Sequence, residues 1–244
     1  EETVQGKCGT QELSFFESFP AGINQAMQRG QIDAGPVSSL EYLYHQDDYL
    51  LLPDLAIGAR IFVRSVLLIS KKKIEQLDRA AIALSRESES SAGLVKILLR
   101  QRYGHRNTFD LVEQDPEAML QKYSAALVIG DAALFCQPKE LVYKYDLGEL
   151  WQSWTGKPFV FSLWAVRKEF VRTNEAAARS FQVALKENLL KNLSDPEGFL
   201  KKALNIVPSD KEFCQMLGYF ANLRYSLDAD MKEGVTRFFE LAHQ

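Results

Sequence analysis

The sequence has few of the residues that build disulfide frameworks and metal centres. Its 244 residues include three cysteines and three histidines. The cysteines, Cys8, Cys136 and Cys214, are odd in number and far apart, which argues against a disulfide framework and fits a reducing compartment. The histidines stand alone, so their spacing predicts neither a zinc site nor a catalytic triad. We therefore expect no metal cofactor.

Long apolar runs and a strong excess of one charge are also absent. No run approaches the roughly 20 apolar residues that a membrane-spanning helix needs, and no signal peptide is visible in the sequence that opens at Glu1. The net charge of −3 argues against a nucleic-acid surface, because such surfaces are strongly basic. We expect a cytoplasmic protein that binds neither membranes nor nucleic acids.

What the sequence does contain is an alternation of short apolar runs and segments of helical periodicity. With 46% apolar and 25% charged residues, the composition is that of an ordinary globular protein. The alternation predicts an α/β fold with mainly parallel sheets. Strands are expected at 32–35, 61–70, 81–84, 108–112, 125–129 and 159–166. Helices are expected at 20–29, 40–45, from about 90, and at 116–121, 131–135, 147–155, 176–190, 196–204 and 230–243.

Serines gather where the strand at 81–84 leads into a helix. Ser85, Ser88, Ser90 and Ser91 lie in this junction, just before Gly93. Free backbone N–H groups, hydroxyl donors and the positive end of the helix dipole favour an anion at such a place. The alternative is that Ser88 or Ser90 only caps the helix. The local pattern leaves both interpretations open.

Two further junctions are similar, and one strand carries a polar interruption. Ser38 and Ser39 follow the first predicted strand, and capping is again an equal alternative for them. Gly130 and Asp131 follow the strand at 125–129, where capping is favoured because a carboxylate repels an anion. Ser65 interrupts the strand at 61–70, so it either bonds to neighbouring backbone or faces a cleft.

Two long predicted strands, 61–70 and 159–166, bracket a block with the size of a small lobe. Ligands in α/β folds collect where helices follow the carboxyl ends of strands. We therefore predict a bilobal fold of the periplasmic-binding-protein type (type II), in which these two strands cross between the lobes. Residues 1–70 and 159–244 would form one lobe, residues 71–158 would form the other, and a small organic anion would bind between them.

Several segments run in order across most of the chain and are specific as a set. They are 35–42 (GPVSSLEY), 64–70 (RSVLLIS), 84–91 (LSRESESS), 128–134 (VIGDAAL), 145–151 (YDLGELW) and 154–161 (WTGKPFVF). Together they resemble the chorismate dehydratase family of the futalosine route to menaquinone. The resemblance implies a cofactor-free enzyme on the bilobal fold, which removes water from chorismate to give 3-[(1-carboxyvinyl)oxy]benzoate.

The resemblance also implies roles for particular residues. Ser65 would be the catalytic residue, hydrogen-bonded near the reacting carbon or the departing hydroxyl. Because no histidine or glutamate base emerges from the motifs, the side-chain carboxylate of the substrate would take the proton. The serines that follow the strand at 81–84 would hold one carboxylate of the substrate. The serines at 38–39 would hold the other carboxylate or the ring, and the glycines, the aspartate and the threonine named below would border the ligand. The implied substrate contacts are Ser38, Ser39, Ser88, Ser90, Ser91, Gly130, Asp131, Thr155 and Gly156.

Family members begin with a strand carrying a Tyr-x-Asn-x-x-Pro-like segment, and nothing in this sequence matches it, since Glu1 falls after it.

Two alternatives to the dehydratase remain. One is the sister family, dihydroxynaphthoate synthase, whose Gly-x-Gly-x-Gly-Pro stretch and well-placed histidine are not seen here. The other is a binding protein that holds a small carboxylate and releases it unchanged. In each case we expect a monomer or a homodimer.

Overall fold

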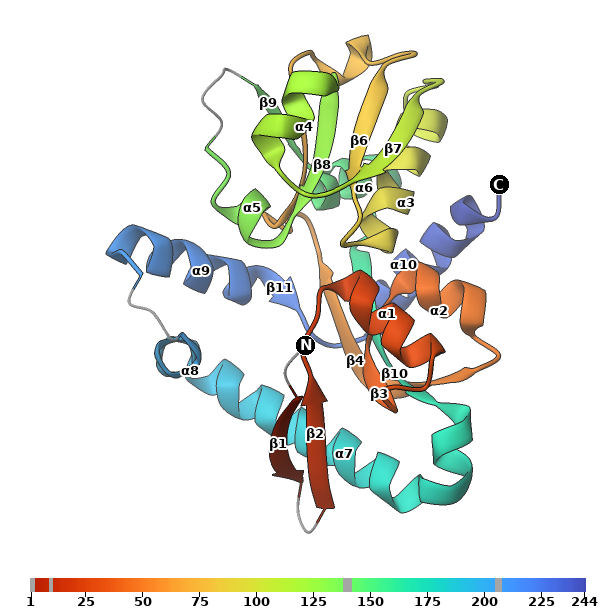
Figure 1. The fold of residues 1–244 in the computed structure, drawn as a ribbon, viewed down its shortest axis with the longest axis vertical. Coiled ribbons are helices and arrows are strands. Elements are labelled where there is room, and N and C mark those ends of the chain that lie inside the picture. Colours follow the sequence, from red (N-terminus) through yellow and green to blue (C-terminus); the bar gives the residue numbers. More distant parts are fainter. Residues whose placement is uncertain (1–2, 9–10, 138–141, 205–207) are drawn as a thin grey trace.

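The computed structural model describes residues 3–8, 11–137, 142–204 and 208–244. Its strands form a four-stranded sheet, a five-stranded sheet and a separate hairpin (Figure 1). The hairpin pairs β1 (Thr3–Cys8) with β2 (Gln11–Phe16). The four-stranded sheet has the order β11 (Leu223–Arg224), β4 (Tyr49–Ala59), β10 (Phe159–Arg167) and β3 (Ala34–Ser38). The five-stranded sheet has the order β7 (Thr108–Val112), β6 (Ala81–Ser85), β8 (Ala125–Ile129), β5 (Val66–Ser70) and β9 (Tyr143–Asp146).

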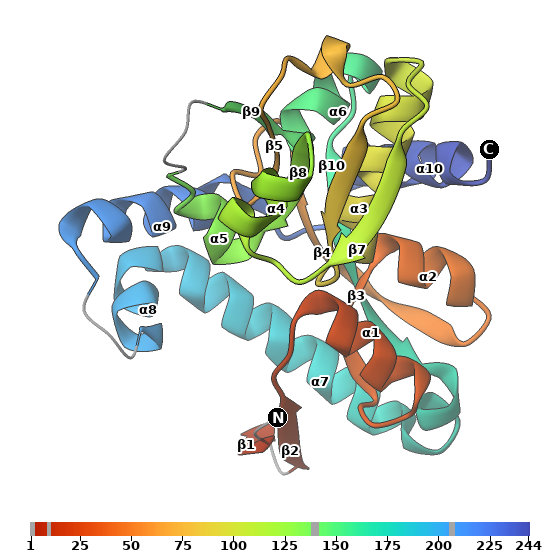
Figure 2. The same cartoon turned by 45° about the horizontal axis from the view of Figure 1, so that its top comes forward.

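Helices cover both faces of the four-stranded sheet. On one face, α1 (Pro20–Gln28) and α10 (Ala229–Ala242) pack against β10 and its neighbours, and α2 (Ser39–His45) follows β3 directly. On the other face lies α7 (Lys168–Ser194), which contains a break at Asn174. In Figures 1 and 2, α7 lies below this sheet and the five-stranded sheet lies above it.

The five-stranded sheet is covered in the same way. Alternate residues of its strands point to opposite faces. Leu127 packs toward α3 (Glu89–Ile97) and α6 (Leu147–Thr155), whereas Val128 packs toward α4 (Pro116–Lys122) and α5 (Gly130–Leu134). Short turns of π-helix (Leu98–Arg102) and 3₁₀-helix (Ile74–Gln76) complete this part.

The expected preference for parallel strands is wrong for much of the structure. Every described pair of the four-stranded sheet is antiparallel. In the five-stranded sheet, β6 is parallel to β7 and β8, but β5 is antiparallel to β8 and β9. The reason is that β5 enters this sheet from the other one, so no crossover helix forces it to run parallel to its neighbour.

The first crossing between the sheets is shorter and less regular than expected. The predicted strand 61–70 starts only at β5, and residues 60–65 before it are irregular. We propose that each sheet is the centre of one lobe, with residues up to 65 and from 159 in one and 66–158 in the other. This moves the predicted boundary from Ser70 to Ser65, because β5 is bonded into the five-stranded sheet.

One apolar cluster continues from one lobe into the other. Trp151 of α6, Phe159 of β10 and Phe238 of α10 are fully buried and meet edge to face, with ring centroids 5.3 Å apart for Trp151–Phe159 and 4.7 Å for Phe159–Phe238. Such aromatic contacts add to the stabilisation that burial itself provides. The lobes are therefore packed firmly together on the side of α6 and α10.

Several elements have no counterpart among the predicted ones. They are the hairpin β1–β2, strands β9 and β11, and helix α9 (Asp210–Asn222), which follows α8 (Pro196–Ala203). Strand β4 continues through Pro53. Residues 52–55 have no partner in β10, so the missing N–H of proline costs no ladder bond there. Among the described residues, no helix is both long and apolar enough to span a bilayer.

Candidate functional site

Ser65 and Gly130 lie side by side at the end of the five-stranded sheet that faces the other lobe. Val66, which opens β5, pairs with Ile129, which ends β8. The Gly130 N–H donates a hydrogen bond of 2.8 Å to the Ser65 carbonyl oxygen. Ligands of α/β folds collect at the carboxyl ends of strands such as β8. Main-chain pairing thus brings together two residues that the sequence singled out separately.

The backbone that leads into Ser65 is held by a buried carboxylate. Asp146 accepts hydrogen bonds from the N–H groups of Val63 (3.1 Å) and Arg64 (2.6 Å). Arg64 has a φ of 65°, in the left-handed region that costs a non-glycine residue on the order of 1 kcal/mol. The bonds to Asp146 retain this conformation, and Ser65, itself buried, follows immediately.

Asp146 also caps helix α6, by accepting hydrogen bonds from the N–H groups of Gly148 (2.9 Å) and Glu149 (3.2 Å). Burial raises the pKa of its carboxyl group, and the hydrogen bonds from the backbone oppose that rise. An acidic residue just before an apolar helix is a recognisable capping signal in the sequence. Its contacts with Val63 and Arg64 have no local signal, so this positioning role escaped the sequence analysis.

Gly130 and Asp131, next to the buried Ser65, are exposed. Gly130 has a φ of 61°, and a Cβ atom built on it would meet no other atom within 4 Å. Asp131 is exposed in the first turn of α5, whose N-cap is Ile129 without any side-chain hydrogen bond. The expectation that Asp131 caps this helix is therefore wrong.

A residue that the sequence analysis missed completes this group. Tyr219, on helix α9, lies near the segment that leads into Ser65, since a Cβ atom built on the neighbouring Gly218 would lie 3.3 Å from Arg64 Nη1. Burial raises the pKa of Tyr219, a hydrogen bond with the Ser65 side chain lowers it, and the charge of Asp131 raises it. Ser65, Gly130, Asp131 and Tyr219 thus form one cluster, which we call the Ser65 site. No separate helix was predicted at 210–222, although Ser209 and Glu212 form a capping box that marks its start in the sequence.

The serines at the start of α3 are engaged with one another and with the other lobe. Ser88 is the N-cap: its Oγ accepts the Ser91 N–H (3.3 Å) and lies 2.8 Å from Ser91 Oγ. Ser90 Oγ accepts the N–H of Leu40 in α2 at 3.0 Å. All three serines are buried. The capping interpretation is confirmed for Ser88, and their contact with a carboxylate stays a prediction.

Ser38 and Ser39 are also bonded within the protein. Ser38 is the N-cap of α2, where its Oγ accepts the Glu41 N–H (3.2 Å) and the side-chain amide of Asn24 (3.0 Å). The Ser39 hydroxyl donates to the carbonyl oxygen of Val160 at 2.6 Å. Both serines are buried. The capping alternative is therefore confirmed for Ser38. A ligand role for Ser38 or Ser39 stays a prediction.

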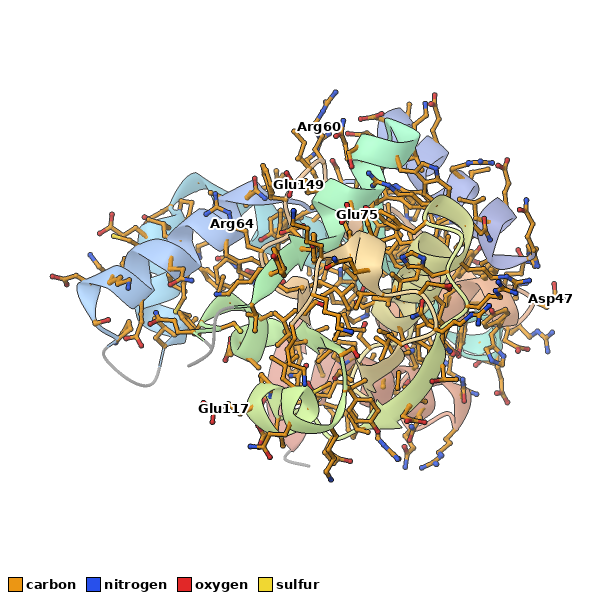
Figure 3. All side chains as sticks on the ribbon, turned by 90° about the horizontal axis from the view of Figure 1, so that it is seen from above. Asp47, Arg60, Arg64, Glu75, Glu117 and Glu149 are labelled. Carbon is orange, nitrogen blue, oxygen red and sulfur yellow. The ribbon has the colours of Figure 1, made fainter. Side chains whose placement is uncertain are left out.

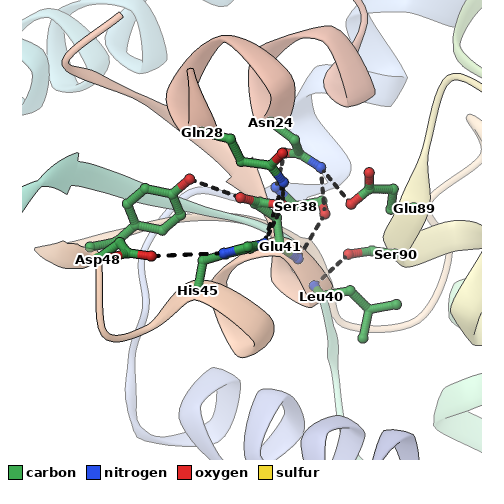
Figure 4. A network of polar contacts seen from close by, with 10 residues as sticks. Asn24, Gln28, Ser38, Leu40, Glu41, His45, Asp48, Glu89 and Ser90 are labelled. Atoms are coloured by element: carbon green, nitrogen blue, oxygen red, sulfur yellow. Dashed lines mark hydrogen bonds and ion pairs between the residues drawn. The ribbon is translucent and has the colours of Figure 1, made fainter. Parts of the chain in front are cut away.

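A network of polar side chains surrounds these serines where the lobes meet (Figure 4). Asn24 Nδ2 donates to Glu89 Oε2 at 2.9 Å, and the buried carboxylate of Glu41 accepts bonds from Gln28 (2.7 Å) and Tyr49 (2.8 Å). Burial and the charge of Glu41 raise the pKa of Glu89, whereas its bond with Asn24 lowers it. Carboxylates of the protein itself thus occupy the region of the α3 N-terminus.

Two hollows lie near predicted residues but away from the Ser65 site. One, of about 750 Å³, lies between α1, α2 and α3; Ser88 and Glu89 line it, and no residue of the Ser65 site does. The other, of about 500 Å³, lies between α6 and α10 and includes Thr155. Among the described residues, no group of three or more His, Cys, Asp or Glu side chains is placed to hold a metal ion.

Thr155 and Gly156 end helix α6 and have structural partners. The Thr155 hydroxyl donates to the Trp151 carbonyl oxygen (2.9 Å) and accepts the Lys157 N–H (3.2 Å). Gly156 has a φ of 72°, the left-handed conformation typical of a helix C-terminus. The structure therefore does not bring these two residues into the Ser65 site, and their contact with a substrate stays a prediction.

Comparisons with solved structures agree on the fold. A protein of Archaeoglobus fulgidus superposes with a TM-score of 0.66 at 17% identity, covering 93% of this chain and 84% of that one. The periplasmic aliphatic sulphonate binding protein of Escherichia coli superposes with a TM-score of 0.60 at 12% identity, covering 92% and 79%. A Candida albicans protein described as having the generic periplasmic binding protein fold gives 0.57 at 9% identity, covering 92% and 78%. The predicted bilobal fold of the periplasmic-binding-protein type is confirmed.

Comparisons of sequence identify the family. A chorismate dehydratase of Thermus thermophilus is 30% identical over 243 residues, which cover 92% of this chain and 85% of that protein. The model of a family described as menaquinone biosynthesis matches residues 8–244, which include every residue of the Ser65 site. The resemblance that the motifs indicated is confirmed, and the chain belongs to this menaquinone biosynthesis family.

Proposed function

We propose that the protein is a chorismate dehydratase, a carbon–oxygen lyase that converts chorismate into 3-[(1-carboxyvinyl)oxy]benzoate and water without a cofactor. The observation that carries this proposal is the 30% identity with the Thermus thermophilus chorismate dehydratase over nearly the whole chain. The position of Ser65 and Gly130 at the carboxyl end of β8, where ligands of α/β folds collect, is consistent with a ligand there.

The reaction breaks two bonds from ring carbons to their substituents, one C–H bond and one C–O bond. A proton leaves the ether-bearing carbon, hydroxide leaves the adjacent carbon, and the electron pair of the broken C–H bond forms the new double bond. The proton and the hydroxide account for the water that is released. Because the product ring is aromatic, the elimination is strongly favoured. Catalysis then depends on orientation and on stabilising the departing oxygen more than on a strong protein base.

The Ser65 site matches these needs. Ser65 would donate a hydrogen bond to the departing hydroxyl, and Gly130 would leave room for the ring because no side chain projects from it. Asp131 would border the substrate and orient it by accepting a hydrogen bond from its hydroxyl group rather than by meeting its carboxylates. The carboxylate on the substrate's own side chain would take the proton, in line with the absence of a histidine or glutamate from the described residues of this cluster.

The test is to incubate the full-length protein with chorismate and to follow absorbance and mass. Loss of one water with the appearance of a benzoate spectrum is the expected result. Binding without any change in mass would contradict the proposal and indicate a carrier of small carboxylates. No binding at all would contradict both the activity and the choice of a small dicarboxylate as ligand.

A further inference from the structure

A glutamine side chain in the loop between β7 and α4 reaches the end of strand β8. This residue, Gln114, is half-buried, whereas its neighbours Glu113 and Asp115 are exposed. The chain then returns to the surface in α4, where Glu117 projects outward in Figure 3. The loop therefore directs one amide group inward, at the sheet end that carries Gly130.

The Gln114 amide pairs with both main-chain groups of Ile129, the last residue of β8. Its Oε1 accepts the Ile129 N–H at 2.7 Å, and its Nε2 donates to the Ile129 carbonyl oxygen at 3.1 Å. Strand β6 pairs with β8 as far as Leu127 and then ends at Ser85, where the α3 junction begins. A side chain thus continues the pairing of β8 beyond the point where its neighbouring strand stops.

The end of β8 is held from both flanks. Alternate residues of a strand direct their main-chain groups to opposite neighbours. Ile129 faces Gln114, and the next residue, Gly130, donates its N–H to the Ser65 carbonyl oxygen at 2.8 Å on the β5 side. A displacement of Ile129 would therefore reach Ser65 through one peptide unit and one hydrogen bond.

A second anchor orients the Gln114 amide. Its Nε2 also donates to Glu87 Oε2 at 3.0 Å. The main chain of Glu87 is held by Ser85, whose Oγ accepts its N–H at 3.2 Å, and by Ala21 of the other lobe, whose N–H donates to its carbonyl oxygen at 3.0 Å. Because the oxygen and both N–H groups of the amide have partners, the amide has one orientation. Gln114 thus connects a contact between the lobes with the strand end beside Ser65.

We propose that Gln114 is a positioning residue for the dehydration, which fixes the end of β8 and thereby the places of Gly130 and Ser65; this role rests on the function proposed above. Misplacing a group at the reacting centre costs on the order of 10- to 100-fold in rate. Ser65 would act on the departing oxygen, whose charge develops in the transition state. Loss of the Gln114 amide should therefore lower kcat about 10-fold and change KM little.

The test compares two ends of strand β7 by chorismate turnover. Gln114→Met keeps the length of the side chain and removes its three hydrogen bonds, and Gln114→Asn keeps the amide but is one methylene shorter. Asn107→Leu is the matched control before β7, because the Asn107 amide donates to the carbonyl oxygens of Leu77 and Ala80. All three variants should lose stability in urea titrations, but only the Gln114 variants should lower kcat about 10-fold.

Two further readouts separate positioning from a general loss of stability. In the Ser65→Ala background, Gln114→Met should change kcat less than about twofold, because the two residues act through one bond. Exchange of the Gly130 amide hydrogen, followed by NMR, should be about 10-fold faster in Gln114→Met and unchanged in Asn107→Leu. If Gln114→Met does not fold, Gln114→Asn takes its place in both measurements.

Three results would overturn the inference alone: a kcat within twofold in a folded Gln114 variant, an equal loss of kcat in Asn107→Leu, or unchanged exchange at Gly130. If the unaltered protein binds chorismate without converting it, or does not bind it, the proposed function fails and the exchange measurement decides. Faster exchange at Gly130 in the Gln114 variant alone would then still support the positioning of this strand end by Gln114.

Discussion

The α3 junction and the Ser65 site lie at the same end of one sheet, yet their hydroxyls have different surroundings. At the α3 junction, Ser88 caps its own helix and Ser90 bonds to α2 of the other lobe. At the Ser65 site, the space over Gly130 is open and Asp131 is exposed. The difference teaches that the packing of the second lobe turns the serines of the α3 junction into structural partners, whereas Gly130 and Asp131 beside the buried Ser65 stay exposed.

The largest effect is expected for Ser65→Ala. Removing one oriented donor to a departing oxygen typically lowers turnover by about 100-fold or more, and the unfolding midpoint in urea should change little. Ser70→Ala is the matched control at the other end of β5, where the hydroxyl donates to the Lys72 carbonyl oxygen. An unchanged turnover of chorismate in Ser65→Ala would remove this residue from the mechanism.

Ser90→Ala tests the structural role of the serines at the α3 junction. The change leaves the buried N–H of Leu40 without its partner, which should lower the free energy of unfolding by about 1–3 kcal/mol in urea titrations. Ser153→Ala, an exposed helical serine, should cost far less. If chorismate affinity falls while stability is kept, Ser90 contacts the ligand and its structural role is secondary.

Gly130→Ala narrows the open space of the Ser65 site. The positive φ should cost about 1 kcal/mol of stability, and the new methyl group should lower kcat/KM about 10-fold by occupying room for the ring. Gly104→Ala is the control, because Gly104 also has a positive φ and open surroundings. It should lose the same stability in urea titrations and no activity. Equal kinetics for both variants would mean that no ligand approaches Gly130.

The smallest effect concerns the acidic network beside the α3 junction. The pKa of Glu89 lies above its ordinary value in the folded protein, so the stability of the native state falls as pH rises through that pKa. Glu89→Gln should therefore raise Tm at pH 7 by about 2 °C, and the difference should vanish in acid, where both side chains are neutral.

Glu212→Gln provides a control of opposite sign. Hydrogen bonds from Ser209 hold the pKa of Glu212 below its ordinary value, so its contribution is present at neutral pH and is lost as pH falls through that pKa. This variant should have a lower Tm at pH 7. A lower Tm for Glu89→Gln as well, measured by calorimetry across pH, would contradict the interpretation of the network.

Helices and strands with strong local signals were predictable. Helix α6 begins after the capping Asp146 and ends at Gly156, and β8 is the apolar run 125–129, because caps and periodicity act within a few residues. Strand β9 was not predictable, because it is short and polar on one side. Helix α9 was not predicted as a separate element, although its capping box of Ser209 and Glu212 is a local signal.

The sequence by itself determined the bilobal fold, the family and the set of candidate site residues. The tertiary structure decided which of those residues form a site, because their partners come from distant segments. Ser90 meets Leu40, Ser39 meets Val160, and Ser65 meets Gly130. A hydroxyl has the same local preferences wherever it ends a strand, and only the packing of one lobe on the other determines whether a backbone group or open space faces it.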